Sequence, residues 1–373
     1  MRFSWDMTPP PPPLLVLTAE SQDFDPATVK NWKDEGYEVT YLPFLEDRAE
    51  YVDRLKHLAD RLELGEKHAI VAYGEAATVV LDVCMKPMFK LGTLVAYYPT
   101  KTAHKPSDYP SSLEIIIHLA SSQELETTLR SYQYSDTEPG FAEADLETFH
   151  KVSSSLAWSR TLGAVRKGLE IEVDLEKIWE EHLALEFAQK DAIETMKTMI
   201  AQPYVNHIPT MTGGIGHDDL LRFYRDFFIP HNPSSLRITL VSRTVGTDRI
   251  VDEMIIAFTH DSVIHWMLPG VQPTGKEVEV ALVSVVCVRG GKLYHEHIYW
   301  DQASVLVQVG LLDRALVPPG QEKFAKRLPV VGGEGARKVL DEKKGVSNEL
   351  IEGWKEGENA SKENGQIGTH GDH

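Results

Sequence analysis

The chain has 373 residues, of which 42% are hydrophobic, and its formal net charge is -18 at pH 7. Because domains usually contain about 100–200 residues, this length predicts two domains, and the hydrophobic content is sufficient for buried cores. The negative charge argues against a nucleic-acid partner and against an anionic membrane surface, since both attract basic proteins. We therefore expect a small molecule as the ligand.

Cysteine usage is low. The two cysteines, Cys84 and Cys287, lie far apart in the chain and in apolar surroundings. This usage is typical of a reducing compartment and does not suggest a disulfide framework. The first residues contain no apolar signal core, and no apolar run reaches the roughly 18 residues that cross a membrane. The sequence therefore predicts a cytoplasmic protein with no membrane contact.

After a proline-rich lead-in at 1–13, strand and helix patterns alternate. Short apolar runs predict buried strands, and the intervening segments have helical periodicity. In chain order they are 14–19 (strand), 26–35 (helix), 37–42 (strand), 47–64 (helix), 68–73 (strand), 75–85 (helix), 94–98 (strand), 113–119 (strand) and 146–169 (helix). Such alternation is typical of a parallel sheet covered on both faces. Residues 14–168 are therefore predicted to form a doubly wound α/β domain.

The strand, turn and helix around Gly74 lie where an α/β-hydrolase places its nucleophile elbow. Together with Tyr97-Tyr98-Pro99 and the phrase Ala-Trp-Ser-Arg-Thr-Leu at 157–162, they resemble the dienelactone hydrolase family. The resemblance implies an α/β-hydrolase fold for this domain.

The catalytic triad of that family is missing. Gly74 stands at the nucleophile position, Pro139 at that of the histidine, and 121–123 (Ser-Ser-Gln) at that of the aspartate. An enzyme without a nucleophile and a base cannot catalyse acyl transfer by this mechanism. We therefore interpret this domain as a hydrolase fold without hydrolase activity.

From residue 174 the pattern changes to helices followed by strands. The predicted helices are 175–190, 193–199 and 218–228, with an irregular segment at 204–210, and the predicted strands are 236–243, 249–258, 264–268, 278–289 and 292–301. This order is typical of an α+β fold in which a curled sheet encloses a pocket.

Several phrases of the segment 174–312 resemble the SnoaL-like polyketide cyclases of the NTF2-like superfamily. They are Ile-Pro-Thr at 208–210, Phe-Thr-His-Asp at 258–261, Trp-Met-Leu-Pro-Gly at 266–270 and the stretch 291–301. The resemblance implies a curved antiparallel sheet forming a cone with helices, and a homodimer. It also implies aldol-type cyclisation or isomerisation of a polyketide-like carbonyl compound without metal or cofactor, with Asp301 as the acid/base residue.

The strand that ends at Asp301 carries a row of titratable side chains. Because side chains alternate between the faces of a strand, His295, His297, Tyr299 and Asp301 share one face. The partner segment 278–288 is apolar on both faces, which predicts burial. Burial raises the pKa of a carboxyl group and makes it a better base, and imidazoles are suited to stabilising an enolate. We therefore predict catalytic roles for Asp301, His297 and His295 and substrate contact for Tyr299.

Three further residues are predicted to bind substrate. Trp266 offers a flat wall, His207 lies near the expected mouth of the pocket, and Glu253 lies on a neighbouring strand. Each has a structural alternative: a core side chain, a loop histidine and a cross-strand ion pair with Arg243, respectively. Asp301 likewise has the alternative role of capping a helix that begins at residue 302.

A zinc site is a further alternative, because two histidines at i, i+2 on one strand form a known ligand geometry. His295 and His297 would then be joined by Asp301 or Glu253. Since the cyclases that the segment resembles use no metal, we predict neither a metal nor a cofactor.

Apolar residues become sparse from residue 318, which predicts a largely disordered charged tail over 318–373, with a short helix near 336–343. The leading functional hypothesis is a SnoaL-like cyclase or isomerase of an aromatic or polyketide-like molecule, joined to an inactive hydrolase-fold domain. The alternatives are a non-catalytic small-molecule binding or scaffold protein, and a hydrolase of the dienelactone type that uses other groups.

Overall fold

The structure is a computed structural model that describes residues 11–45, 47–101, 105–317, 319–323, 325–351 and 353–354. The chain divides into two compact units. The first spans residues 1–178 with the short segments 246–249 and 288–292, and the second spans 179–245, 250–287 and the residues from 293 onward. Within the described residues, no helix combines the length and the apolar character that crossing a membrane requires.

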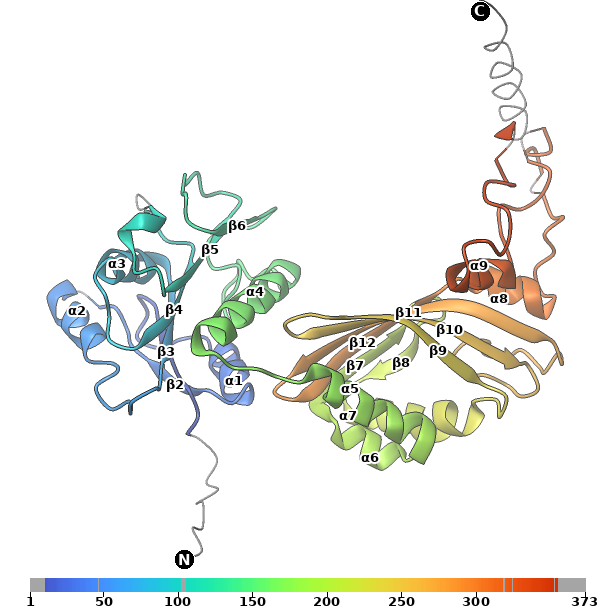
Figure 1. The fold of residues 1–373 in the computed structure, drawn as a ribbon, viewed down its shortest axis with the longest axis horizontal. Helices are drawn as coiled ribbons and strands as arrows, with labels where there is room; N and C mark the ends of the chain where they lie inside the picture. Colours follow the sequence, from blue (N-terminus) through green and yellow to red (C-terminus); the bar gives the residue numbers. More distant parts are fainter. Residues whose placement is uncertain are drawn as a thin grey trace, which may run out of the picture. The chain divides into compact units, whose positions relative to one another are not determined.

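The first unit contains a six-stranded parallel sheet with helices on both faces (Figure 1). In spatial order its strands are β2 (Glu38–Tyr41), β1 (Leu14–Thr18), β3 (His68–Tyr73), β4 (Leu91–Tyr97), β5 (Glu114–Ala120) and β6 (Ser131–Tyr134). The helices are α1 (Pro26–Asp34), α2 (Arg48–Lys56), α3 (Gly74–Cys84) and α4 (Lys151–Leu169), with the short 3-10 helix η1 (Pro106–Asp108). The predicted doubly wound α/β fold is confirmed. The sequence missed β6, because its residues are mostly polar.

Each face of this sheet packs against its own pair of helices. Leu15 belongs to a core cluster with Trp32 of α1 and Trp158 of α4. Leu14, which points to the other face, belongs to a cluster with Leu55 of α2 and with α3. Because every residue of β1 and β3 is buried, these strands appear in the sequence as continuous apolar runs.

The turn between β3 and α3 has the geometry of an elbow but no nucleophile. Gly74 has φ of +57°, in the left-handed region that favours glycine. A Cβ at this position would lie 2.5 Å from Oε1 of Glu20. The same carboxylate accepts a hydrogen bond from the backbone N–H of Glu75, the group that helps bind the oxyanion in α/β-hydrolases. Glu20 therefore fills the place of both the nucleophile and the oxyanion.

The second unit is built on a six-stranded mixed sheet. In spatial order its strands are β8 (Thr212–Ile215), β7 (Met199–His207), β12 (Lys292–Trp300), β11 (Glu277–Arg289), β10 (Arg249–Thr259) and β9 (Arg237–Val245). The strand β7 is parallel to β12 and antiparallel to β8, whereas β9 and β10 are antiparallel to each other. The α+β class is therefore confirmed, with a mixed sheet in place of the antiparallel one that was expected.

The helices of this region follow the chain in two groups. Before and between the first strands are α5 (Leu175–Leu183), α6 (Ala192–Lys197) and α7 (His217–Phe223), with the π-helices η2 (Ala184–Gln189) and η3 (Tyr224–Phe228) and the 3-10 helix η4 (Ile229–His231). After the last strand come α8 (Gln302–Val309) and α9 (Gly333–Leu340). The helices α5, α6 and α7 lie along one face of the sheet (Figure 1).

Two local predictions for this part of the chain were wrong. Strand β7 occupies residues for which the end of a helix and an irregular segment were predicted, because polar residues in this segment obscure the alternation of a strand. Residues 264–268 form turns rather than a strand. The short helix expected near 336–343 is present as α9: Ala336 is buried there, and Arg337 pairs with Glu279 of β11 at 2.7 Å. Residues 1–10 of the lead-in and 355–373 of the tail lie outside the described residues.

Candidate functional site

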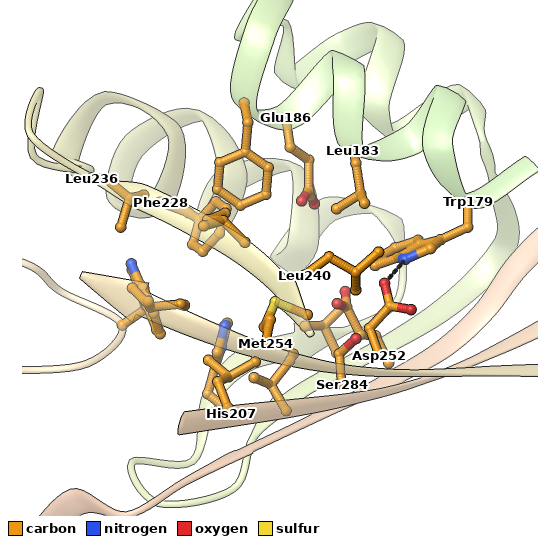
Figure 2. Close-up of a pocket in the computed structure, with 18 of the residues that line it drawn as sticks. Trp179, Leu183, Glu186, His207, Phe228, Leu236, Leu240, Asp252, Met254 and Ser284 are labelled. Atoms are coloured by element: carbon orange, nitrogen blue, oxygen red, sulfur yellow. Dashed lines mark hydrogen bonds between the residues drawn. The ribbon is translucent and has the colours of Figure 1, made fainter. Parts of the chain in front are cut away.

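A cavity of about 330 Å³ lies in the second unit, between the sheet and the helical segments α5, η2 and η3 (Figure 2). This volume is at the lower end of the range for small-molecule pockets, roughly 300–1,000 Å³. Most of the wall is apolar, and its larger side chains include Trp179, Phe187, Phe228, Leu240, Met254 and Trp266. The polar and titratable side chains of the wall, apart from the two indoles, are Glu186, His207, Tyr224, Arg243, Asp252, Ser284 and Glu296.

Two of the helical segments that line the cavity, η2 and η3, are π-helices and not α-helices. The π-helix η2 carries Glu186 and Phe187, and the π-helix η3 carries Tyr224 and Phe228. Short π-helical turns are rare and occur frequently at functional sites, because they displace side chains from their α-helical positions. The two irregular turns therefore identify this cavity as the candidate site.

Glu296 is a buried carboxyl group with no compensating partner. It lies on β12, is 7% exposed and contributes to the cavity wall. Within the described part of the chain its carboxyl group has no hydrogen-bond partner. Burial raises the pKa of Glu296 well above its usual value, and the nearby carboxylates of Glu186 and Asp252 raise it further. The surroundings therefore favour the protonated, uncharged form.

Next to it, His182 and Glu186 form a buried hydrogen-bonded pair. Nε2 of His182 lies 3.0 Å from Oε1 of Glu186, and Nδ1 lies 2.6 Å from the hydroxyl oxygen of Thr198. The Thr198 hydroxyl donates to the backbone carbonyl of Thr195, so Nδ1 must be the donor to Thr198. Both ring nitrogens of His182 are therefore engaged in hydrogen bonds, which fixes the orientation of the ring.

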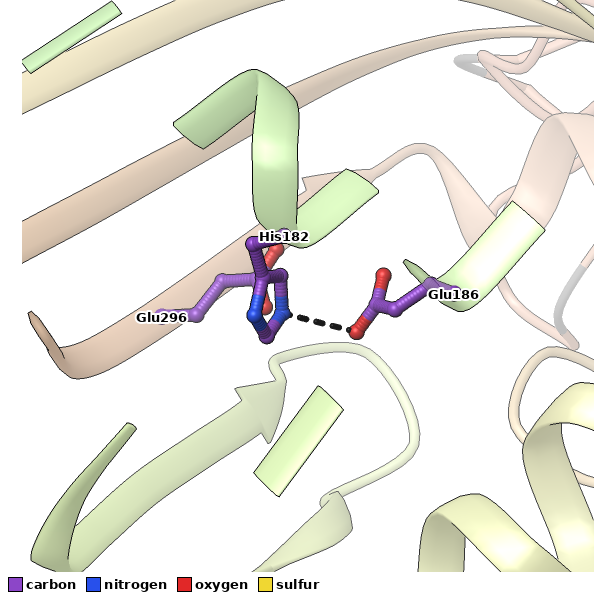
Figure 3. Close-up of side chains that lie close together, drawn as sticks. All are labelled: His182, Glu186 and Glu296. Carbon is purple, nitrogen blue, oxygen red and sulfur yellow. Dashed lines mark hydrogen bonds and ion pairs between the residues drawn. The ribbon is translucent and has the colours of Figure 1, made fainter. Parts of the chain in front are cut away.

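His182, Glu186 and Glu296 form one cluster (Figure 3). All three are buried, and their donor atoms lie within 4.8 Å of one another. Such a set of one nitrogen and two carboxylates has the composition of a site for a divalent ion. Within the set, His182 and Glu186 are joined by a hydrogen bond. The zinc set considered from the sequence, His295 with His297, lies elsewhere.

Another part of the cavity wall contains a buried ion pair between Asp252 and Arg243. Asp252 is 1% exposed and accepts hydrogen bonds from Nε and Nη2 of Arg243, at 2.7 and 2.9 Å. It also accepts one from the indole N–H of Trp179 at 2.8 Å (Figure 2). Arg243 donates further to Glu180 at 3.1 Å. Because the two charges neutralise each other, the pair leaves the wall without a net charge.

His207 lies on the same face of the sheet as Glu296. In the parallel pairing of β7 with β12, Val205 is opposite Glu296 and His207 is opposite Ile298. His207 and Glu296 are therefore about 7 Å apart along the strand direction. Nδ1 of His207 donates to the backbone carbonyl of Thr212 at 3.2 Å, which leaves Nε2 as an acceptor. Burial lowers the pKa of His207 to about 4, so its imidazole is uncharged at neutral pH.

The catalytic residues predicted from the sequence lie outside the cavity wall. Asp301 is exposed and caps α8, because its carboxylate accepts hydrogen bonds from the backbone N–H of Ala303 at 3.0 Å and from the hydroxyl of Ser304. The rings of His295 and His297 stack on each other with centroids 4.7 Å apart. None of these three lines the cavity, and neither does Tyr299, which is 43% exposed.

The physical reason is that β12 turns its opposite face inward. The register between β12 and β7 shifts between Leu293 and His295. After this irregularity the buried positions of the strand are Glu296, Ile298 and Trp300. Because side chains alternate with a period of two, His295, His297 and Tyr299 then point to the opposite face. The prediction that Asp301 faces a dry cavity is therefore wrong.

The predicted substrate-binding residues divide between wall and surface. Trp266 and His207 line the cavity, and their ring centroids lie 5.1 Å apart. Glu253 of β10 does not line it and instead accepts a hydrogen bond from Ser242 of β9 at 2.9 Å. Arg243, the partner expected for Glu253, pairs with Asp252. Substrate contact by Trp266 and His207 stays a prediction.

Sequence reasoning missed His182, Glu186, Glu296 and Asp252. A signal for the first two was present: they follow Trp179 at spacings of three and seven residues, so they lie on the apolar face of an amphipathic helix. Titratable residues on such a face are rarely buried without a function. Glu296 and Asp252 carried no comparable signal, because the strand pattern does not identify the inner face.

The comparisons with known proteins agree with this part of the fold. Residues 179–296 match the family described as SnoaL-like domain. None of the curated proteins matches the chain. The expected SnoaL-like resemblance is therefore confirmed for this segment, which forms most of the second unit and contributes most of the cavity wall.

Similar solved structures exist for both units. TsrD from Streptomyces laurentii is 16% identical and covers 38% of this chain and 100% of its own, with a TM-score of 0.31. A candidate SnoaL-like polyketide cyclase from Jannaschia sp. is 15% identical and covers 38% of this chain and 98% of its own, with a TM-score of 0.29. A candidate dienelactone hydrolase from Klebsiella pneumoniae is 12% identical and covers 43% of this chain and 89% of its own, with a TM-score of 0.34. At these identities and TM-scores nothing about activity follows from the likeness.

Proposed function

We propose that the second unit is an enzyme that moves protons within a small carbonyl compound, as isomerases and cyclases do. Glu296 is the proton donor and His207 the proton acceptor. The observation that carries this proposal is that two groups on one face of an apolar cavity have pKa values displaced in opposite directions: that of Glu296 is raised and that of His207 is lowered. Environments that separate a pair of titratable groups in this way are how enzymes assign acid and base roles.

The reaction needs only side chains of the chain. The protonated carboxyl group of Glu296 donates a hydrogen bond to the carbonyl oxygen of the substrate and stabilises the negative charge that develops on it. Nε2 of His207 takes a proton from the carbon next to the carbonyl. In an isomerisation His207 returns the proton to a different carbon. In a cyclisation the enolate carbon attacks a second carbonyl carbon, and the alkoxide that forms takes the proton from His207.

The SnoaL-like match of residues 179–296 supports this class of reaction. In the resemblance stated above the acid/base residue is Asp301, and the proposal replaces it with Glu296. The hydrolase alternative has no support in the elbow turn, because Glu20 occupies the place of the nucleophile. A binding protein without turnover is the alternative that the experiment must separate.

The test is the exchange of the acidic C–H protons of β-tetralone in deuterium oxide, followed by NMR. We expect the full-length protein to accelerate exchange. Glu296→Gln, which keeps the shape of the side chain, and His207→Gln should each lower the catalysed rate by about 100-fold or more. The matched control is Glu253→Gln, a carboxylate outside the cavity, which should keep the wild-type rate.

The pH dependence of the exchange rate is a second test of the proposal in the same assay. The rate should fall as the pH drops through about 4, where His207 becomes protonated. It should also fall at high pH as Glu296 loses its proton. A Glu296→Gln variant that exchanges at the wild-type rate would place the chemistry elsewhere. Saturable binding of the probe without exchange would contradict the proposal and favour the binding protein.

A further inference from the structure

Ser284 of β11 is a buried hydroxyl with no partner. It is 2% exposed, it lines the cavity, and among the described residues its Oγ has no hydrogen bond. Figure 2 shows it on the sheet side of the cavity. Buried polar groups in native proteins nearly always have a hydrogen-bond partner, so an orphan on a cavity wall indicates a group supplied by a ligand. Glu296, on the neighbouring strand β12, also lines the cavity.

The charged groups of the wall are engaged by the protein itself. Arg243 and Asp252 form a two-pronged ion pair, and Glu186 interacts with His182 and with the phenol of Tyr224. A ligand anion would therefore meet no available cation, and it would lie near carboxyl groups in an apolar surrounding. Burying an uncompensated charge is strongly unfavourable. The wall thus selects against acids and accommodates neutral molecules.

We infer that the ligand of this cavity is an uncharged carbonyl compound, such as a ketone or an ester, and that Ser284 is a second donor to its carbonyl oxygen. The inference rests on the proposed function for the role of Glu296 as the first donor. Two donors on adjacent strands hold the carbonyl oxygen at the sheet side of the cavity, while the carbon skeleton contacts the aromatic wall. A free carboxylate of the same size is excluded.

The role of Ser284 is tested by calorimetric titration of the full-length protein with β-tetralone and with tetralin, the same skeleton without the carbonyl. Ser284→Ala should weaken the binding of β-tetralone by roughly three- to tenfold and leave that of tetralin unchanged. Ser262→Ala is the matched control, because Ser262 also has an orphan Oγ but does not line the cavity. Equal effects of Ser284→Ala on both probes, or no effect on either, would overturn the assignment.

The charge selectivity is tested with tetralin carboxylate and its methyl ester. At pH 7 the ester should bind at least about tenfold more tightly than the acid. Asp252→Asn removes one charge of the ion pair and leaves that of Arg243, so it should strengthen binding of the acid with little change for the ester. Wild-type protein that binds the acid as tightly as the ester would refute the inference, whether or not the Asp252→Asn variant folds.

These outcomes are independent of the exchange assay. If Glu296→Gln retains full exchange while the Ser284 and charge effects appear, the proposed acid is wrong and the ligand class stands. If exchange depends on Glu296 while both probe comparisons fail, the catalytic proposal stands and the ligand class is wrong.

Discussion

Buried carboxyl groups in the same cavity differ in how their charge is compensated. Asp252 receives three hydrogen bonds, two of them from a guanidinium group, and so forms a complete ion pair. Glu296 has no such donor among the described residues, and burial acts on it without opposition. Carboxyl groups of one cavity therefore serve both as a structural ion-pair partner and as a candidate acid.

The raised pKa of Glu296 predicts a pH-dependent contribution to stability. The folded pKa lies above the value of about 4.5 expected in the unfolded chain, so this contribution is present below about pH 4.5 and is lost as the pH rises through the folded pKa. A glutamine cannot ionise. We therefore expect Glu296→Gln to become progressively more stable relative to the wild type between pH 4.5 and pH 8, as measured by urea unfolding. A constant difference over this range would show that the environment of Glu296 is not as described, and Glu253→Gln serves as the control.

At the scale of single elements, Asp301 lies between the end of β12 and the start of α8, and the sequence allowed two interpretations of its role. An aspartate after a strand and before a helix is a candidate catalytic group and a candidate N-cap. The hydrogen bond from the N–H of Ala303 is that of a cap. Since the following helix α8 buries Ser304, Val305 and Val309, loss of the cap should affect the stability of the unit.

For this element we expect Asp301→Ala to lower the free energy of unfolding by about 1 kcal/mol, and Asp301→Asn to lower it by much less, because asparagine also caps helices. Both variants should keep the wild-type rate of β-tetralone exchange, since Asp301 does not line the cavity. Urea unfolding and the exchange assay measure the two effects. Loss of exchange in a variant that remains folded would restore Asp301 as a catalytic residue.

At the scale of the whole molecule, both units contain histidines that are buried in uncharged form. In the first unit burial lowers the pKa of His68 to about 4 and that of His118 to about 3, and in the second unit it lowers that of His207 to about 4. His118 is held by hydrogen bonds to Tyr134 at 2.8 Å and Thr161 at 2.9 Å, so its ring is fixed in place as well as desolvated. These imidazoles take up protons more readily in the unfolded chain.

Acid should therefore destabilise both units. Each folded pKa lies below the unfolded value of 6.5, so this contribution to stability is present above about pH 6.5 and is lost as the pH falls toward 4. The loss is on the order of 3 kcal/mol for each histidine. Circular dichroism of urea unfolding between pH 7 and pH 4 measures it. His207→Gln should reduce the slope and His217→Gln, an exposed position, should leave it unchanged; equal slopes in all three proteins would contradict the expectation.

The sequence by itself determined the classes of fold and the absence of a hydrolase triad. Continuous apolar strands such as β1 and β3 can only be buried on both faces, and a glycine at position 74 offers no nucleophile whatever surrounds it. These properties depend only on neighbouring residues in the chain, so the sequence was sufficient to predict them.

Only the tertiary structure decided where the site lies. The inner face of β12 depends on its place in the sheet beside β7, a strand more than 80 residues earlier in the chain. The meeting of Glu296 with His182 and Glu186 likewise depends on how a helix packs across the sheet. Because the alternating pattern of β12 is the same whichever face is turned inward, packing against distant segments decided that Glu296, and not Asp301, lines the cavity.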